Sequence, residues 1–238
     1  MVDRRDPHLP LPPRSVIGIL GSGQLGRMLA QAATQLGFRV HIYADESGPA
    51  FDVAAHHEIG PYDDLGRLDA FARGVDVVTY EFENVPLVAA QHLDARVLVR
   101  PGGLALGVAQ DRLEEKRFIS AIGIGVAPFA SVRTPADVAA AAAVMAGWQS
   151  PAILKTARLG YDGKGQIPVD HPDDLAAAHQ ALHGAPCVLE KRVSFAFEIS
   201  MLVVRGADGA LGFYDPPRNT HAEGICDSPS CRADWHLQ

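Results

Sequence analysis

Residues 154–166 read LKTARLGYDGKGQ, and this stretch decides how the second half of the chain folds. One apolar run ends at Leu154 and another begins after Gln166, so the pattern predicts a strand, a glycine loop and a second strand. Glycine lets backbone N–H groups approach a ligand closely, and consecutive N–H groups in such a turn can hold an anion. With Lys155 at the mouth of the loop and Lys164 inside it, the favoured ligand is a polyphosphate. The simplest alternative is an exposed hairpin turn.

Lysine is rare in this chain, which makes the two lysines of the loop informative. Of 21 Lys and Arg residues, only four are lysines, namely Lys116, Lys155, Lys164 and Lys191. The compact lysine charge and the rigid arginine fork are not interchangeable at a phosphate site. The loop is not the one that opens a helix in nucleotide-binding proteins, because the G-x-x-x-x-G-K-[ST] spacing is absent.

Composition bounds the class of protein. The 238 residues suffice for one large or two ordinary domains, and a net charge of −7 argues against nucleic-acid and anionic-membrane partners. Three cysteines in no C-x-x-C spacing predict neither a disulfide framework nor a zinc site, and they fit the cytoplasm. No apolar run approaches the ~20 residues that a bilayer requires. Residues 1–14 are expected to form a disordered leader and not a signal peptide.

The first half of the chain opens with a strand, a glycine turn and a helix. Residues 16–20 predict a buried strand, GSGQLGR follows at 21–27, and a helix then runs to Gly37. Such a turn offers N–H groups to an anion. One alternative function is therefore a nicotinamide-dependent oxidoreductase, although these glycines also serve close helix packing. Its residues would be Gly21, Gly23, Gly26 and Asp45. The apolar residues of the helix are Leu25, Met28, Leu29, Ala32 and Leu36.

Further strands complete a parallel α/β sheet of about four strands. They are predicted at 39–43, 75–80 and 96–99, with a helix at 65–73. The strand at 75–80 ends in Glu81, Glu83 and Asn84, and carboxylates and amides at the carboxyl end of a parallel strand lie where α/β folds bind ligands. An alternative is that Glu83 or Asn84 caps the helix that starts at Pro86.

The second half has an α+β pattern with antiparallel strands. A charged helix at 111–122 places Arg112 and Lys116 on one face, and the simplest interpretation pairs both with acidic neighbours at exposed positions. Asp-Gly at 208–209 predicts a hairpin between its two neighbouring strands. The strands are expected at 129–132, 152–155, 166–169, 187–190, 197–205 and 211–214, and the helices at 135–146 and 173–182.

Five motifs together resemble one family of enzymes. They are GSGQLGRML at 21–29, YEFENVP at 80–86, QDR at 110–112, GYDGKGQ at 160–166 and NTH at 219–221. In these residues the chain resembles the 5-(carboxyamino)imidazole ribonucleotide synthases, ATP-grasp enzymes of purine synthesis. The resemblance implies a doubly wound parallel preATP-grasp domain at 15–107 and an incomplete α+β ATP-grasp domain at 108–225. Within the latter it implies a lid at about 126–190 and the start of a second subdomain from 190.

The resemblance implies ATP- and bicarbonate-dependent carboxylation of 5-aminoimidazole ribonucleotide. It gives Lys155, Tyr161 and Asp162 a part in catalysis, and it makes residues 190–193 the connector whose backbone contacts adenine. The ATP residues it implies are Arg112, Lys155, Gly160, Tyr161, Asp162, Gly163, Lys164, Gly165, Gln166, Glu190, Lys191, Arg192, Val193, Glu198 and His221. The implied substrate residues are Gly23, Gln24, Leu25, Tyr80, Glu81, Glu83 and Asn84.

The resemblance also implies Mg²⁺ with ATP, a homodimer and a possible carboxymutase partner. The family's acidic Mg²⁺ ligands follow the matched region and are not found in this sequence, and residues 226–238 form an atypical tail. The expectation is therefore that this chain by itself does not catalyse the family's reaction. A different ATP-grasp carboxylase or ligase is the alternative within the superfamily, and YEFENVP weighs against it.

Overall fold

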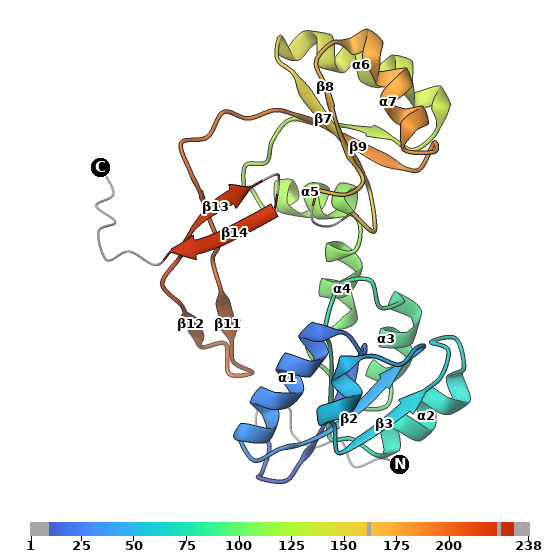
Figure 1. Ribbon diagram of the computed structural model, residues 1–238, viewed down its shortest axis with the longest axis vertical. Coiled ribbons are helices and arrows are strands. Elements are labelled where there is room, and N and C mark those ends of the chain that lie inside the picture. The colour runs from blue at the N-terminus through green and yellow to red at the C-terminus, as the bar shows by residue number, and fades with distance from the viewer. Residues whose placement is uncertain (1–9, 161–162, 223–224, 231–238) are drawn as a thin grey trace. The chain divides into compact units, whose positions relative to one another are not determined.

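A computed structural model describes residues 10–160, 163–222 and 225–230, which form parts of two compact units, Met1–Gln110 and Asp111–Gln238 (Figure 1). Most of the expected leader and tail, and the loop residues Tyr161 and Asp162, lie outside the described residues. The boundary expected between residues 107 and 108 falls inside helix α4, which spans Gly103–Ala109.

A parallel five-stranded sheet organises the first unit, and the predicted doubly wound α/β fold is confirmed. Its order is β3-β2-β1-β4-β5, and every neighbouring pair is parallel. The expected count of about four strands was wrong, because β3 has the sequence HHEI and lies at the edge. A polar edge strand lacks the apolar run by which the other strands are recognised. The strands are β1 Val16–Leu20, β2 Arg39–Ala44, β3 His56–Ile59, β4 Val77–Tyr80 and β5 Leu98–Val99.

Helices cover both faces of this sheet. Neighbouring residues of one strand face opposite ways, so Ile19 packs with α1 and η1, whereas Leu20 packs with α2 and α3. Helix α1 packs through Gly26, Ala30 and Ala33, while Leu25 and Met28 are exposed. The expected apolar face of α1 is therefore not its packing face. The elements are α1 Gln24–Gln35, η1 Pro49–Val53, α2 Leu65–Arg73 and α3 Leu87–Asp94.

Helices α2 and α3 differ in how their first turns are capped. Asp64 caps α2, because its carboxylate accepts a hydrogen bond from the Arg67 N–H at 3.0 Å. Helix α3 begins after Pro86 without a side-chain cap. The interpretation of Glu83 or Asn84 as a cap of α3 was therefore wrong. Capping does not explain why these two polar residues follow β4.

His41 makes the first unit sensitive to acid. Burial, together with the nearby His56 and His57, lowers the pKa of His41 from its ordinary 6.5. The ring packs edge-on against Phe71 at a centroid distance of 4.9 Å. The unfolded chain therefore takes up this proton at a higher pH than the folded unit, so His41 makes stability fall as the pH drops through 6.5.

We expect His41→Phe, which keeps an aromatic ring beside Phe71, to flatten the loss of stability on acidification. For one titrating group, the free energy of unfolding changes by at most ~1.4 kcal/mol per pH unit. The measurement is urea unfolding at pH 5.5 and 7.5, followed by pulsed hydrogen exchange and mass spectrometry of peptides from 15–110. The exposed His171→Phe serves as the control. An unchanged pH dependence in His41→Phe would show that other groups cause the sensitivity.

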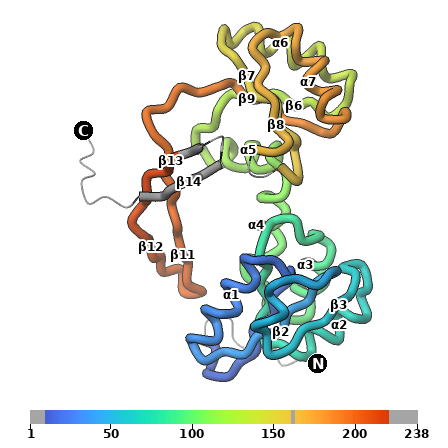
Figure 2. The backbone as a smooth tube through the Cα atoms, in the orientation of Figure 1, coloured from blue at the N-terminus to red at the C-terminus, as the bar shows by residue number. Residues whose placement is uncertain are grey.

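An antiparallel four-stranded sheet organises the second unit, with the order β6-β9-β7-β8. Figure 2 traces the backbone of these strands and of helices α6 and α7. One face packs on α6 and α7, and the opposite face contacts α5 through Leu113. The predicted α+β pattern is confirmed. The strands are β6 Phe129–Val132, β7 Ala152–Thr156, β8 Gln166–Val169 and β9 Cys187–Lys191. The helices are α5 Arg112–Ala121, η2 Pro135–Asp137, α6 Val138–Trp148, η3 Pro172–Asp174 and α7 Leu175–Ala181.

The later strands form two further small sheets. The predicted hairpin is present, since β11 pairs with β12 and Gly209 adopts a φ of +85° in its turn. The single strand expected at 197–205 was wrong, because its first part, β10, pairs with β13 instead. The strands are β10 Glu198–Ile199, β11 Val203–Arg205, β12 Leu211–Phe213, β13 Arg218–Ala222 and β14 Ile225–Ser230. In the described ranges, every helix is too short or too polar to span a bilayer.

Candidate ATP site and glycine turn

Strand alternation brings Lys155 and Glu190 to one face of the four-stranded sheet. Leu154 and Leu189 point into the core beneath α6 and α7, so the residues after them point to the α5 side. The Lys155 Nζ atom lies 3.0 Å from Glu190 Oε2. Only 26% of the Lys155 side chain and 12% of the Glu190 side chain are exposed. The two predicted ATP residues therefore form a partly buried ion pair.

The glycine loop after β7 has a backbone that only glycine accommodates easily. Gly163 and Gly165 adopt φ values of +73° and +70°. A Cβ atom on Gly165 would lie 2.6 Å from Thr156 Oγ1, and one on Gly160 would lie 3.0 Å from the same oxygen. The Thr156 N–H also donates to the Gly165 carbonyl at 2.8 Å. Thr156 thus occupies the centre of the loop, although no motif in the sequence marks it.

The Arg112 side chain holds this loop through hydrogen bonds to backbone carbonyls. Its two terminal nitrogens donate to the carbonyls of Thr156 at 2.9 Å and Gly160 at 2.7 Å. The arrangement uses the planar fork of arginine, which a lysine cannot reproduce. The interpretation that Arg112 pairs with acidic neighbours at an exposed position was therefore wrong.

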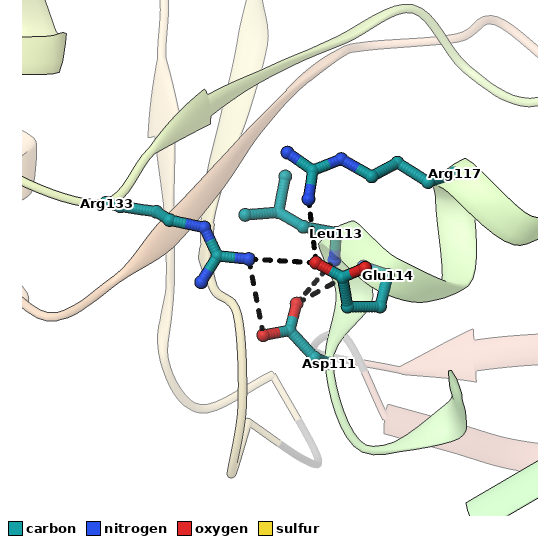
Figure 3. Close-up of polar contacts among 5 residues, drawn as sticks. All are labelled: Asp111, Leu113, Glu114, Arg117 and Arg133. Carbon is teal, nitrogen blue, oxygen red and sulfur yellow. Dashed lines mark hydrogen bonds and ion pairs between the residues drawn. The ribbon is translucent and has the colours of Figure 1, made fainter. Parts of the chain in front are cut away.

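Helix α5 carries Arg112 because Asp111 fixes its first turn. The Asp111 carboxylate accepts hydrogen bonds from the N–H groups of Leu113 at 2.9 Å and Glu114 at 3.3 Å, as Figure 3 shows. Arg133 lies 3.8 Å from Asp111 and 3.1 Å from Glu114, and Arg117 lies 2.7 Å from Glu114. A capped start fixes the directions in which the next side chains leave the helix.

The remaining predicted ATP residues fall into separate groups. In the connector, the N–H groups of Lys191 and Arg192 donate to the carbonyls of Pro128 and Pro151, which ties it to the sheet. Glu198 lies in the three-stranded sheet, where it accepts from Asn219 Nδ2 at 3.1 Å. The residues Lys164, Gln166 and Val193 are exposed. His221 belongs to β13, but its side chain lies outside the described part, as do Tyr161 and Asp162.

The glycine turn of the first unit holds a carboxylate from its own chain. Glu81 accepts hydrogen bonds from the N–H groups of Gly23 at 2.7 Å and Gly26 at 2.5 Å. A Cβ atom on Gly21, Gly23 or Gly26 would lie 2.4, 2.9 or 3.0 Å from a carboxylate oxygen of Glu81. All three glycines thus make room for Glu81. An external pyrophosphate would have to displace this carboxylate, which weighs against the nicotinamide alternative.

The other predicted substrate residues lie around this turn or after β4. Gln24 and Leu25 begin α1 and are exposed. Burial raises the pKa of Tyr80, so its phenol stays neutral at ordinary pH. Asn84 Oδ1 is buried and accepts no hydrogen bond from any described residue, while its amide nitrogen lies 3.5 Å from Glu83. A buried acceptor without a partner is unusual and calls for a ligand or water.

Within the described ranges, no group of three or more His, Cys, Asp or Glu side chains could hold a metal ion. Burial raises the pKa of the Cys187 thiol to about 11, so it stays protonated and unreactive.

Comparison with known proteins places these features in a family. One family model, the ribonucleotide synthetase preATP-grasp domain, matches residues 15–110, and the ATP-grasp domain matches residues 117–236. An N5-carboxyaminoimidazole ribonucleotide synthase from Brucella melitensis is 42% identical over 231 residues, which are 96% of this chain and 63% of that protein.

Solved structures agree with the sequence relatives. The N5-carboxyaminoimidazole synthetase from Staphylococcus aureus with ADP superposes with a TM-score of 0.84 at 34% identity, over 91% of this chain and 57% of that one. The synthase from Aspergillus clavatus, in complex with ADP and 5-aminoimidazole ribonucleotide, gives 0.77 at 28% identity, over 90% and 55%. The chain thus spans less than two thirds of each of these proteins. It belongs to the ATP-grasp family, and within that family it is similar to the N5-carboxyaminoimidazole ribonucleotide synthases.

Proposed function

We propose that this chain binds ATP in its second unit and serves the ATP-dependent carboxylation of 5-aminoimidazole ribonucleotide. The observation that carries the proposal is the glycine loop after β7. Arg112 donates hydrogen bonds to its backbone carbonyls, and Thr156 packs against its glycines. Lys155 lies at its base. Similarity to a synthetase solved with ADP supports the nucleotide, and similarity to a synthase solved with 5-aminoimidazole ribonucleotide supports the substrate. The product would be N5-carboxyaminoimidazole ribonucleotide, in purine synthesis.

In the proposed reaction, bicarbonate attacks the γ-phosphorus of ATP, and ADP leaves. The 5-amino nitrogen then attacks the carboxyl carbon of the carboxyphosphate and phosphate leaves, or it attacks the CO2 that forms once the carboxyphosphate has lost phosphate. In either case the nitrogen loses a proton. Phosphoryl transfer depends mainly on positioning and on neutralisation of phosphate charge. Lys155 would supply positive charge, and the N–H groups of the glycine loop would supply hydrogen-bond donors.

For the first unit we propose that the segment after β4 contacts the ribonucleotide. The buried, unpaired Asn84 Oδ1 supports this role, since a ligand hydroxyl or amine could donate to it. Tyr80 and Glu83 would lie beside it, with Gly23, Gln24 and Leu25 at the turn. Glu81 would act by shaping the turn, because two backbone N–H groups already hold its carboxylate.

Other parts of the proposal rest on the family alone. Mg²⁺ would accompany the ATP phosphates and neutralise their charge, and no described residue is assigned to it. Catalytic parts for Tyr161 and Asp162 and ATP contacts by Glu198 and His221 remain predictions. The same holds for the homodimer, the carboxymutase partner, the cytoplasmic location and the exclusion of nucleic acid and membrane.

Replacement of Lys155 with methionine tests the nucleotide site. If the ammonium group donates to a phosphate, Lys155→Met weakens ATP binding by about 1.5–3 kcal/mol, the range for a charged hydrogen bond. The measurement is calorimetric titration of the folded chain with a non-hydrolysable ATP analogue. Arg205→Met, which removes an exposed cation from the β11–β12 hairpin, should leave the affinity unchanged.

Two results would contradict the proposal. Unchanged affinity in folded Lys155→Met would show that the loop is an ordinary hairpin. Binding of NAD without binding of ATP would favour the oxidoreductase alternative. If the chain turns over, contrary to the expectation that it is inactive by itself, ADP release that requires both bicarbonate and 5-aminoimidazole ribonucleotide would separate this reaction from those of other ATP-grasp carboxylases and ligases.

A further inference from the structure

Glu190 lies between two lysines from different parts of the second unit. Its Oε2 atom is 3.0 Å from Lys155 Nζ, and its Oε1 atom is 3.2 Å from Lys116 Nζ. Both side chains are largely buried, with 15% of Lys116 and 12% of Glu190 accessible. Lys116 thus has an acidic partner, as the simplest interpretation expected, but the expectation that the pair is exposed was wrong.

The fold places Lys116 at this point through helix α5 and strand β6. Asp111 caps the first turn of α5, Leu113 packs on the sheet face that carries Glu190, and Lys116 follows three residues later on the same side. Phe129 lies directly opposite Glu190 in the β6–β9 ladder, and the Lys116 ammonium lies 5.8 Å from the centre of its ring. The ring and the carboxylate together fix the position of Lys116.

The cluster has one more positive than negative charge. While Lys155 pairs with Glu190, the carboxylate has two cationic partners. When Lys155 binds a phosphate, its hold on Glu190 weakens, and a largely buried carboxylate left without a partner would be strongly unfavourable. Glu190 also begins the connector, so a shift of its side chain would disturb the segment expected to contact adenine.

We propose that Lys116 is a positioning residue that holds Glu190 in place when Lys155 turns to the phosphates of the nucleotide. Lys116 does this without touching the nucleotide itself. The inference rests on the proposed function, because it takes Lys155 to be the phosphate ligand. It adds a residue that the family resemblance did not assign, and it explains why one carboxylate has two lysine partners.

The first test is a double-mutant cycle on ATP affinity. We expect Lys116→Met to weaken binding of a non-hydrolysable ATP analogue about tenfold, within the range of coupling between contacting residues. Binding of adenosine should be unchanged, because adenosine leaves Lys155 on Glu190. In a Glu190→Gln background the same substitution should have no further effect, since the neutral amide needs no cationic partner. Lys116→Arg should restore most of the affinity.

Arg117→Met is the matched control, because Arg117 is a cation one residue further along α5 that pairs with Glu114 and not with Glu190. It should leave ATP affinity unchanged. Two results would overturn the inference. One is equal loss of ATP affinity on Lys116→Met with and without Glu190, which would show that Lys116 binds the nucleotide directly. The other is equal loss for adenosine and ATP, which would show a general packing defect.

The second test does not need a nucleotide. The Lys155 amine is labelled with an acylating reagent in the free protein, and the labelling rate is measured by mass spectrometry. We expect Lys116→Met to slow the labelling of Lys155, because Glu190 then holds Lys155 alone, and Glu190→Gln to speed it. Unchanged rates would overturn the sharing of Glu190 even if ATP binds. Absence of ATP binding in the unmodified chain, with the expected labelling rates, would instead refute the proposed function.

Discussion

Gly21→Ala is expected to destabilise the first unit by about 3–5 kcal/mol. Two costs add up at this position. Gly21 has a φ of +110°, a region that costs a residue with a Cβ atom roughly 1–3 kcal/mol. The new methyl carbon would also lie 2.4 Å from Glu81 Oε1, so the carboxylate must move away from the Gly23 and Gly26 N–H groups. Weakening charged hydrogen bonds costs about 1.5–3 kcal/mol each.

Gly37→Ala provides a matched control for the backbone cost. Gly37 has a φ of +83°, and no atom lies within 4 Å of a Cβ atom placed there. The free energy of unfolding of this variant should fall by only about 1–2 kcal/mol. Urea unfolding followed by pulsed hydrogen exchange of peptides from 15–110 measures both variants. Equal losses in the two would show that contact with Glu81 contributes nothing, and the account of the three glycines would then be wrong.

Arg112→Met is expected to destabilise the second unit by about 3 kcal/mol and to loosen the glycine loop. The substitution removes two charged hydrogen bonds to the carbonyls of Thr156 and Gly160, each worth about 1.5–3 kcal/mol before allowance for partial exposure. Hydrogen exchange of peptides covering residues 156–166 should rise in the absence of nucleotide. ATP affinity should fall as well, because the loop must then be ordered on binding.

Arg112→Lys separates the shape of the side chain from its charge. A lysine keeps the positive charge but cannot donate to both carbonyls in the same fork geometry. Fast loop exchange is therefore expected to persist in this variant. If loop exchange in Arg112→Met matches the unmodified chain while ATP affinity falls, Arg112 contacts the nucleotide directly and does not act through the loop.

Elements whose own residues carry a local signal could be predicted from the sequence. Strand β1 is an apolar run followed directly by a glycine turn, and the loop after β7 is bounded by two apolar runs. Asp208 and Gly209 marked the β11–β12 hairpin, because this dipeptide adopts the required backbone. Strand β3 gave no such signal, since a polar edge strand needs only backbone pairing with β2.

Contacts between residues far apart in the chain could not be predicted from local sequence patterns. Lys116 and Glu190 meet only because α5 packs on the face of β9 opposite α6 and α7. The role of Arg112 was likewise hidden, because its partners are backbone carbonyls, which every residue has. The alternation of Leu154 and Lys155 did hold a usable signal. It places Lys155 on the side of the sheet away from the main core, and the same rule applied to Leu189 places Glu190 beside it.

The internal carboxylate at the first glycine turn affects how such turns are recognised in genome-wide searches. A search for G-x-G-x-x-G after a strand would retrieve this chain as a dinucleotide binder, although the group that fills the turn comes from 58 residues further along. A filter that also looks for an acidic residue just after the fourth strand of the sheet would separate self-filled turns from open ones. The same test would guide cofactor engineering, since exchanging Glu81 for a small neutral residue would be the first step toward opening this turn to an external anion.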